Sequence, residues 1–174
     1  MPTPERTSTA EIVAAGREIL ESAGPAGLTM QAVAARVGVR PPSLYKRVRD
    51  KDALHTAIAV ASIDALTARL DAAGDDLTAL ATAYRAFAQE HPEGFRFLFT
   101  VDVPREALER SAAPLIRASS ALVGDDDALD AARLFTAWAT GFLQMELSGA
   151  FRLGGDVDRA FEYGLRMLLT GLAD

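Results

Sequence analysis

The sequence predicts an all-α fold, and three observations support this prediction. No segment shows the sustained alternation of apolar and polar residues that a half-buried strand requires, whereas several segments repeat apolar residues at helical spacing. Hydrophobic residues make up 49% of the 174 residues, which is enough to bury a core. Cysteine is absent, which excludes disulfides, thiol nucleophiles and thiolate zinc sites and favours an intracellular protein. We expect about nine helices in total.

The first two helices are delimited by capping residues and glycines. Ser8 or Thr9 can cap the first helix, which should end at Gly24. Thr29 can cap the second, whose apolar residues recur at helical spacing until Gly38 ends it after about two turns.

The third and fourth helices follow closely. The third is short and begins at Pro41 and Pro42, because proline suits the first helical turn, where its missing N–H has no helical partner. Leu44 and Val48, at positions i and i+4, give this helix an apolar face. The fourth should span residues 50–70.

The rest of the chain also reads as helical. Pro114 should kink or divide one of these helices, because it removes an N–H in the helix interior. The two histidines, His55 and His91, lack the i, i+4 partner of a helical metal site, so we expect no metal and no cofactor. The expected helices cover residues 77–89, 95–99, 105–123, 128–148 and 156–172.

The charge is unevenly distributed. The net charge of -6 argues against nucleic acid as a partner, but residues 1–55 carry +2 and the remainder carries -8. Between positions 36 and 51 Asp50 is the single acidic residue. A basic cluster on two short helices suits a DNA-binding helix-turn-helix, although a solvated charged face explains the charge equally well. The cluster consists of Arg36, Arg40, Lys46, Arg47, Arg49 and Lys51.

Residues 28–54 resemble the DNA-binding domain of the tetracycline-repressor (TetR) family of bacterial transcription regulators. Most members have Phe where this chain has Val48. The resemblance implies a three-helix helix-turn-helix domain over residues 1–52 and a helical effector-binding and dimerisation domain over residues 53–174. The positions that match in register are Thr29, Ala34, Gly38, Val39, Leu44, Tyr45, Lys51 and Leu54.

The resemblance also indicates which residues contact DNA. Tyr45 can be buried beside Leu44, but the family pattern places its hydroxyl on a phosphate, which we favour. Lys51 opposes the dipole of the fourth helix, so a phosphate partner explains it better than helix stability does. Arg and Lys can bind guanine edges, and proline rings can contact thymine methyls. The expected DNA-binding residues are Thr29, Gln31, Arg40, Pro41, Pro42, Ser43, Tyr45, Lys46, Arg47 and Lys51.

A half-site read by one short helix has limited area, so such modules act as two-fold dimers on palindromes. The penultimate helix is apolar nearly all round, and its Gly141, like Gly164 in the last helix, is explained by close helix crossing. The family resemblance implies dimerisation through these two helices. The expected dimerisation residues are Leu134, Gly141, Leu147, Phe161, Gly164, Leu165 and Leu168.

Aromatic residues and one methionine of the C-terminal part are candidates for an apolar effector cavity, although ordinary core is the simpler interpretation of any one of them. Glu146, in an apolar helix, is expected to pair with an arginine of the bundle. Residues 138–141 and 143–149, with residues 84–92 upstream, resemble a C-terminal subgroup of the family named for a Trp-His-Gly element, but the His is missing here. The candidate ligand-binding residues are Tyr84, Phe87, Phe95, Phe99, Trp138, Phe142 and Met145.

The expected function is therefore that of a ligand-responsive, DNA-binding transcriptional regulator. It should be a cytoplasmic repressor that binds a double-stranded DNA operator as a homodimer and is released by a small-molecule effector. The alternative is a dimeric, small-molecule-binding helical protein without DNA binding. An enzyme is not expected, because no paired His and carboxylate and no phosphate-binding glycine loop are present. Residues 1–6 are polar and the uncharged runs are short, so we expect neither a secretory signal nor a membrane partner.

Overall fold

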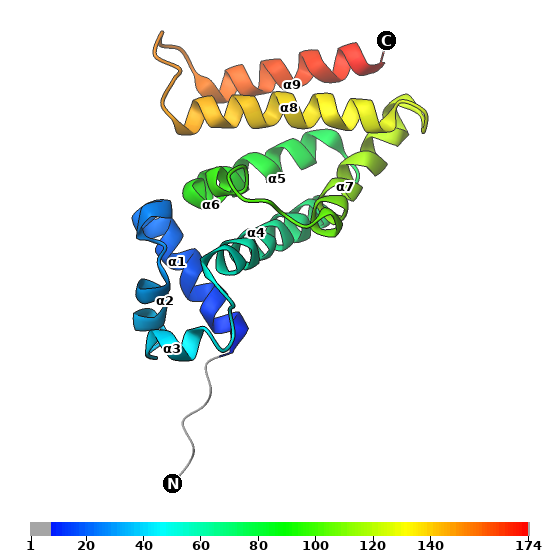
Figure 1. Cartoon of the computed structure of the whole chain (residues 1–174). Helices are drawn as coiled ribbons and strands as arrows, with labels where there is room; N and C mark the ends of the chain where they lie inside the picture. The colour runs from blue at the N-terminus through cyan, green and yellow to red at the C-terminus, as the bar shows by residue number, and fades with distance from the viewer. Residues whose placement is uncertain (1–7, 174) are drawn as a thin grey trace. The chain divides into compact units, whose positions relative to one another are not determined.

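The computed structural model describes residues 8–173, and their regular secondary structure is helical throughout (Figure 1). The all-α prediction is confirmed. The polar start of the chain, residues 1–7, which begins the predicted DNA-binding domain, lies outside the described residues. The helices are α1 (Thr9–Gly27), α2 (Met30–Arg36), α3 (Pro41–Leu44), α4 (Lys51–Ala73), α5 (Leu77–Glu90), α6 (Pro92–Phe97), α7 (Arg105–Val123), α8 (Ala128–Leu147) and α9 (Val157–Ala173).

The chain packs as two compact units. Among the described residues, the first consists of residues 8–63 and 91–104, and the second of residues 64–90 and 105–173. The boundary between the two units therefore falls within α4, whereas the domain boundary predicted from the sequence lies at residue 52. Helix α6 also packs as part of the first unit, although it follows α4 and α5 in the chain. Phe97 of α6 explains part of this difference, because it is buried in the core of the first unit.

The core of the first unit depends on a close approach between α1 and α4. A Cβ atom on Gly16 would lie 2.4 Å from Cδ1 of Ile58, so a larger residue here would force the Ile58 side chain to move. Ser8 and Glu11 form a capping box at the start of α1. At Gly24, with φ of +66°, α1 is interrupted, and one further helical turn extends to Gly27. The predicted helix end at Gly24 is therefore a break within α1.

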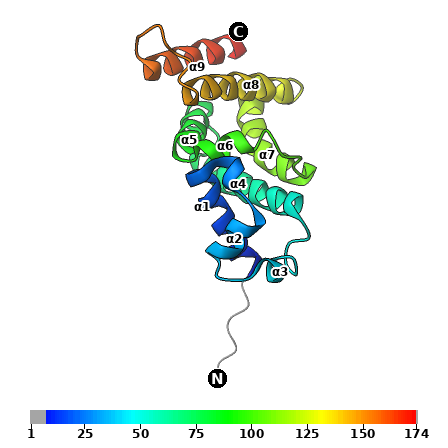
Figure 2. The same ribbon diagram turned by 60° about the vertical axis from the view of Figure 1, so that its left-hand side comes forward.

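The second unit is built around α8, which contacts α5, α7 and α9. Figures 1 and 2 both show α8 and α9 side by side. Helix α7 passes through Pro114, which is buried, so this proline does not divide the helix, and the alternative expectation of a kink stays a prediction. Leu77, Leu80 and Phe87 give α5 its buried face.

Helix α4 is long and apolar because it contributes to the cores of both units. Leu54 and Ile58 are fully buried in the first unit, and Leu66 and Leu70 are buried in the second. Among the described residues, α4 is also the helix that is long and apolar enough to cross a membrane by length and composition. This criterion is weak, because core helices of water-soluble proteins meet it as well.

Candidate nucleic-acid interface and effector cavity

The turn between α2 and α3 is fixed by local hydrogen bonds. Thr29 caps α2, its hydroxyl accepting from the Ala32 N–H at 3.0 Å. At the other end the Val39 N–H donates to the Ala34 carbonyl at 2.9 Å and the Gly38 N–H to the Ala35 carbonyl at 3.2 Å. This pair of bonds is a Schellman motif, which requires a left-handed residue, and Gly38 supplies it with φ of +73°.

Helix α3 is anchored by two buried side chains. Leu44 and Val48 are buried, and the Val48 N–H donates to the Leu44 carbonyl at 3.0 Å, which extends the helical path beyond α3. Pro41 and Pro42 occupy its first turn, as predicted. Because the anchors are four residues apart on one face, the residues between them point away from the core.

The ten residues predicted to bind DNA lie on α2, on α3 with the turn after it, and at the start of α4. Nine of the ten are exposed, and Pro41 is half-buried. The Tyr45 side chain is 51% exposed, which rules out its alternative interpretation as a core residue. Lys51 opens α4 next to Asp50, which accepts from the Ala53 N–H at 2.8 Å. The structure thus brings the predicted residues onto the surface of one unit, and their contact with DNA stays a prediction.

The basic cluster divides into paired and unpaired cations. Arg36 forms an ion pair with Glu18 at 2.7 Å, and Arg49 forms one with Asp50, also at 2.7 Å. The hydrogen bond from the Ala53 N–H, reinforced by Arg49, holds the pKa of Asp50 below its ordinary value. The remaining four basic side chains are exposed and form no ion pair with any described residue. They are Arg40, Lys46, Arg47 and Lys51.

The second unit contains a cavity of about 150 Å³ between α4, α5, α7 and α8. Its most buried lining residues are apolar, and Tyr84, Ser111 and Thr136 supply hydroxyl groups. The Tyr84 hydroxyl forms a 2.9 Å hydrogen bond with Thr140 Oγ1, and burial raises the pKa of Tyr84. The lining consists of Leu66, Leu70, Leu80, Tyr84, Ser111, Ala112, Leu115, Phe135 and Thr136.

Of the seven residues predicted to line an effector cavity, Tyr84 lines this one. Phe87 is fully buried core of the second unit. Phe95 and Phe99 belong to the first unit, where their rings contact each other at 5.4 Å. The remaining predicted residues, on α8, lie outside this lining. Most of the actual lining carries no distinctive sequence signal, because leucines and small residues from four helices resemble ordinary core.

Trp138 and Phe142 instead belong to an aromatic cluster that joins α8 to α9. The Trp138 ring stacks on Phe161 at 5.2 Å between centroids, and Phe142 contacts Phe161 at the same distance. A Cβ atom on Gly164 would lie 2.8 Å from Cζ2 of Trp138. Close helix crossing at Gly164 is therefore used within the chain. Leu165 is buried beside this cluster, whereas Leu147 and Leu168 are half-buried.

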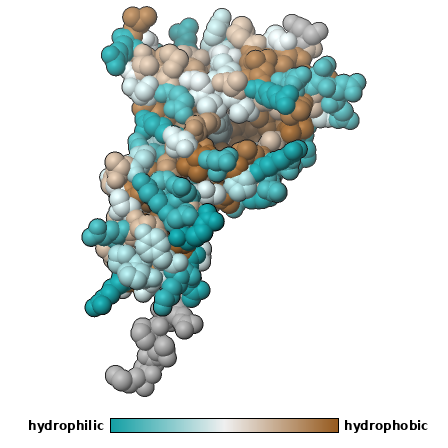
Figure 3. Space-filling model, in the orientation of Figure 1, coloured by the Kyte–Doolittle hydropathy of each residue, from teal (hydrophilic) through white to brown (hydrophobic). Residues whose placement is uncertain are grey.

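The other predicted dimerisation residues lie on an exposed face of α8. Leu134 is 50% exposed, and a Cβ atom on Gly141 would meet nothing within 4 Å. Met145, predicted as a ligand contact, is exposed on the same helix, and Tyr163 and Met167 are exposed on α9. Figure 3 shows hydrophobic side chains gathered over the helices of the second unit, whereas the surface over α2 and α3 is mainly hydrophilic.

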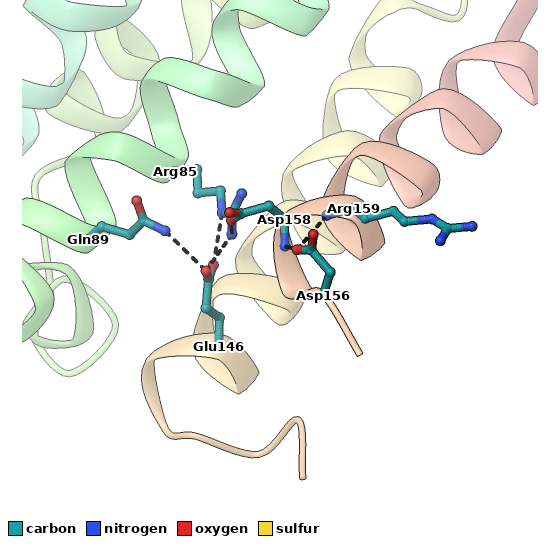
Figure 4. A network of polar contacts seen from close by, with 6 residues as sticks. All are labelled: Arg85, Gln89, Glu146, Asp156, Asp158 and Arg159. Atoms are coloured by element: carbon teal, nitrogen blue, oxygen red, sulfur yellow. Dashed lines mark hydrogen bonds and ion pairs between the residues drawn. The ribbon is translucent and has the colours of Figure 1, made fainter. Parts of the chain in front are cut away.

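Glu146 pairs with an arginine, as the sequence analysis predicts. Its carboxylate accepts two hydrogen bonds from Arg85 of α5, at 2.6 and 3.0 Å, and one from Gln89 at 3.1 Å (Figure 4). Arg85 also donates to Asp158 of α9 at 2.6 Å and lies over the Phe161 ring. Glu146 foremost, and Asp158 after it, raise the pKa of Arg85. This network therefore ties α5, α8 and α9 together.

Comparisons with known proteins agree with this arrangement. The family model described as "Bacterial regulatory proteins, tetR family" matches residues 5–58, which include the helix-turn-helix. The model described as "Tetracyclin repressor-like, C-terminal domain" matches residues 77–168. The two matches together cover both units of the chain.

Proteins similar to this chain include transcriptional regulators. An uncharacterised HTH-type transcriptional regulator of Mycobacterium tuberculosis, Rv0681, is 30% identical over 97% of this chain and 83% of its own length. The crystal structure of Mycobacterium smegmatis BioQ is 30% identical, with a TM-score of 0.71 over 96% of this chain and 98% of that one. A possible TetR family transcriptional regulator from Streptomyces coelicolor A3(2) is 26% identical, with a TM-score of 0.75 over 94% and 97%. The chain belongs to the tetR family of bacterial regulatory proteins, and it is a DNA-binding transcriptional regulator.

Proposed function

We propose that the chain is a repressor that binds a palindromic operator as a homodimer and leaves it when a small, largely apolar effector binds the second unit. One observation carries the proposal. Four exposed cations without an acidic partner among the described residues surround a short helix that Leu44 and Val48 hold in place. A fixed helix with free positive charge is what the major groove and its flanking phosphates require.

The contacts divide by chemistry. Arg40, Lys46 and Arg47 are exposed and adjoin α3, and we assign them to base edges together with Pro42 and Ser43. Thr29, Tyr45 and Lys51 are assigned to phosphates, which position the unit without reading sequence. Gln31 and Pro41 are the remaining two of the ten residues predicted to bind DNA.

Dimerisation is proposed through the exposed face of α8 and α9. Leu134, Gly141 and Met145 lie on one side of α8, because their spacings of seven and four residues follow the helical repeat. Tyr163 and Met167, four residues apart, continue the exposed apolar surface on α9. Open space above Gly141 would admit a partner helix at close range.

Effector release is proposed to act through α4. This helix supplies Leu54 and Ile58 to the core of the first unit and Leu66 and Leu70 to the cavity lining of the second. A ligand that favours one conformer of α4 changes the spacing of two recognition helices in a dimer, which must be about one DNA turn, roughly 34–36 Å. A coupling free energy of about 1–3 kcal/mol is typical of such linkage.

Two finer assignments accompany this function. The segment from Trp138 to Gly141 supports membership of the subgroup named for a Trp-His-Gly element, although Ala139 and Thr140 stand between these residues. A repressor of bacterial genes acts in the cytoplasm, where its operator lies.

The experiment is DNA binding measured by fluorescence anisotropy with the region upstream of the protein's own gene and a scrambled duplex. Specific binding should weaken steeply with salt. Tyr45→Phe and Lys51→Gln should weaken it further, each by about tenfold or more. Arg36→Gln is the control, because this cation is already paired with Glu18. Absence of binding at every salt concentration would favour a dimeric ligand-binding protein without DNA binding.

A further inference from the structure

The cavity between α4, α5, α7 and α8 limits the size of a ligand that it can hold. Its volume is about 150 Å³, and its buried lining residues Leu66, Leu70, Leu80 and Phe135 are apolar. An apolar cavity of roughly 150 Å³ engineered in another protein binds benzene. One ring with a small substituent therefore fits this cavity, whereas a fused multi-ring ligand does not.

The cavity also limits the charge of its ligand. No charged side chain is found among its lining residues in the described chain. The nearby arginines of α7 already pair with carboxylates of the second unit: Arg110 with Asp64 at 2.8 Å, and Arg117 with Asp71 and Asp75. An anionic group placed among the buried leucines of the cavity would lose its hydration without gaining a cation, which is costly. An uncharged ligand avoids this cost.

Two of the three hydroxyl groups of the lining already donate their protons to backbone carbonyls. Ser111 Oγ donates to the Leu108 carbonyl at 2.9 Å, and Thr136 Oγ1 donates to the Ala132 carbonyl at 2.8 Å. A hydroxyl has one proton and two lone pairs, so both groups retain capacity as acceptors. A ligand with an O–H or N–H group can donate a hydrogen bond to the free lone pairs of these two hydroxyl groups.

We propose that this cavity binds an uncharged molecule the size of one ring that carries a hydroxyl or N–H donor. The ring lies on Leu66, Leu70 and Leu80, and the donor faces Ser111 and Thr136. The proposal names the effector class for the effector unit of the proposed function and rests on that function, but ligand binding and DNA release are measured separately below.

The first test is isothermal titration calorimetry of the full chain with phenol, anisole and benzoate. Phenol should bind once per chain. Anisole has the same ring but no donor, and it should bind about tenfold more weakly. Benzoate should give no measurable binding near neutral pH. Equal affinity for phenol and anisole, or tighter binding of benzoate, would overturn the proposal.

Variants locate the site. The double variant Ser111→Ala and Thr136→Val should bind phenol and anisole equally. Thr82→Val is its control, because the Thr82 hydroxyl makes the same kind of bond, to the Thr78 carbonyl at 2.9 Å, but does not line the cavity. Ala112→Leu should fill the cavity and abolish binding of both ligands, whereas Ala68→Leu, at an exposed position of α4, should not. If the Ala112→Leu variant does not fold, phenol and anisole binding by the hydroxyl variants still tests the proposal.

Anisotropy of labelled DNA with added phenol separates the two proposals. Phenol binding that releases DNA supports both. Phenol binding without release keeps the ligand class but contradicts control of DNA binding through this cavity. Intact DNA binding with no phenol binding contradicts the ligand class and leaves the proposed DNA-binding function standing.

Discussion

Gly94 of α6 donates its N–H to Glu21 Oε1 of α1 at 2.7 Å. The Glu93 N–H donates to the other oxygen of the same carboxylate at 3.2 Å, so one side chain caps the N-terminus of α6. A Cβ atom at position 94 would lie 2.6 Å from Oε1. The glycine and the carboxylate therefore depend on each other, and together they hold α6 within the first unit.

This dependence predicts a non-additive pair of substitutions. Glu21→Ala should lower the free energy of unfolding by about 1 kcal/mol, because it removes a helix cap. Gly94→Ala should cost a similar amount in the wild type by displacing the carboxylate. In the Glu21→Ala background the same change should be neutral or stabilising, since alanine favours a helix by about 1 kcal/mol over glycine. Urea denaturation of the four proteins of this cycle measures the coupling, and strict additivity would contradict it.

The Arg85–Glu146 ion pair should contribute more to stability than an exposed pair does. Its side chains are 12% and 16% exposed, so Glu146→Ala leaves a mostly buried guanidinium with Asp158 as its remaining acidic partner in the described network. The expected loss in free energy of unfolding is about 1–3 kcal/mol. It should be lower than for a fully buried pair, because Arg85 keeps Asp158, which is solvent-exposed, as a partner. Glu109→Ala breaks the exposed pair with Arg105 and should cost less than about 0.5 kcal/mol. Equal losses in thermal or urea denaturation would contradict this ranking.

His55 should make stability depend on pH. Burial, reinforced by Lys51, holds its pKa below the ordinary value of 6.5, and its Nε2 is buried without a hydrogen-bond partner among the described residues. Since the folded pKa is lowered, the unfolded chain binds the proton more readily. The stabilisation is complete above the unfolded pKa and is lost as pH falls towards the folded pKa. Between pH about 7.5 and about 5.5, the wild type should lose more stability than His55→Gln. Identical pH profiles would contradict this role.

Two glycines on the last helices should respond in opposite ways. Gly164→Ala would place Cβ 2.8 Å from the Trp138 ring and should destabilise the chain. Gly141→Ala meets open space and should stabilise the isolated chain by up to about 1 kcal/mol. If α8 forms the dimer face, the same change should weaken dimerisation, which analytical ultracentrifugation measures. Unchanged dimerisation would remove Gly141 from the proposed interface.

The helix-turn-helix could be predicted closely from the sequence because each of its features depends on a distinctive residue. Gly38 supplies the left-handed turn, Thr29 the cap, and Leu44 with Val48 the anchors. Local constraints of this kind can be recognised from the order of residues along the chain. The separation of paired from unpaired cations could not be predicted from the sequence, because Glu18 lies close to Arg36 only after α1 and α2 pack together.

The cavity could not be predicted in the same way. Its lining comes from four helices, whereas the residues predicted from the sequence to line a cavity were mainly large aromatic ones. The largest of them fill space instead: Phe87 is core, and Trp138 packs on α9. Phe95 belongs to the first unit because Glu21 binds the start of α6.

The most direct test of the proposed DNA-binding surface is the salt dependence of DNA affinity in a variant that lacks all four unpaired cations. This variant combines Arg40→Gln, Lys46→Gln, Arg47→Gln and Lys51→Gln. Each lost phosphate contact should reduce the slope of log K against log salt by about 0.9. Loss of Lys51 from both protomers should therefore reduce it by about 1.8, and any phosphate contact of the other three cations should reduce it further. A slope equal to that of the wild type would show that DNA is not bound through this surface.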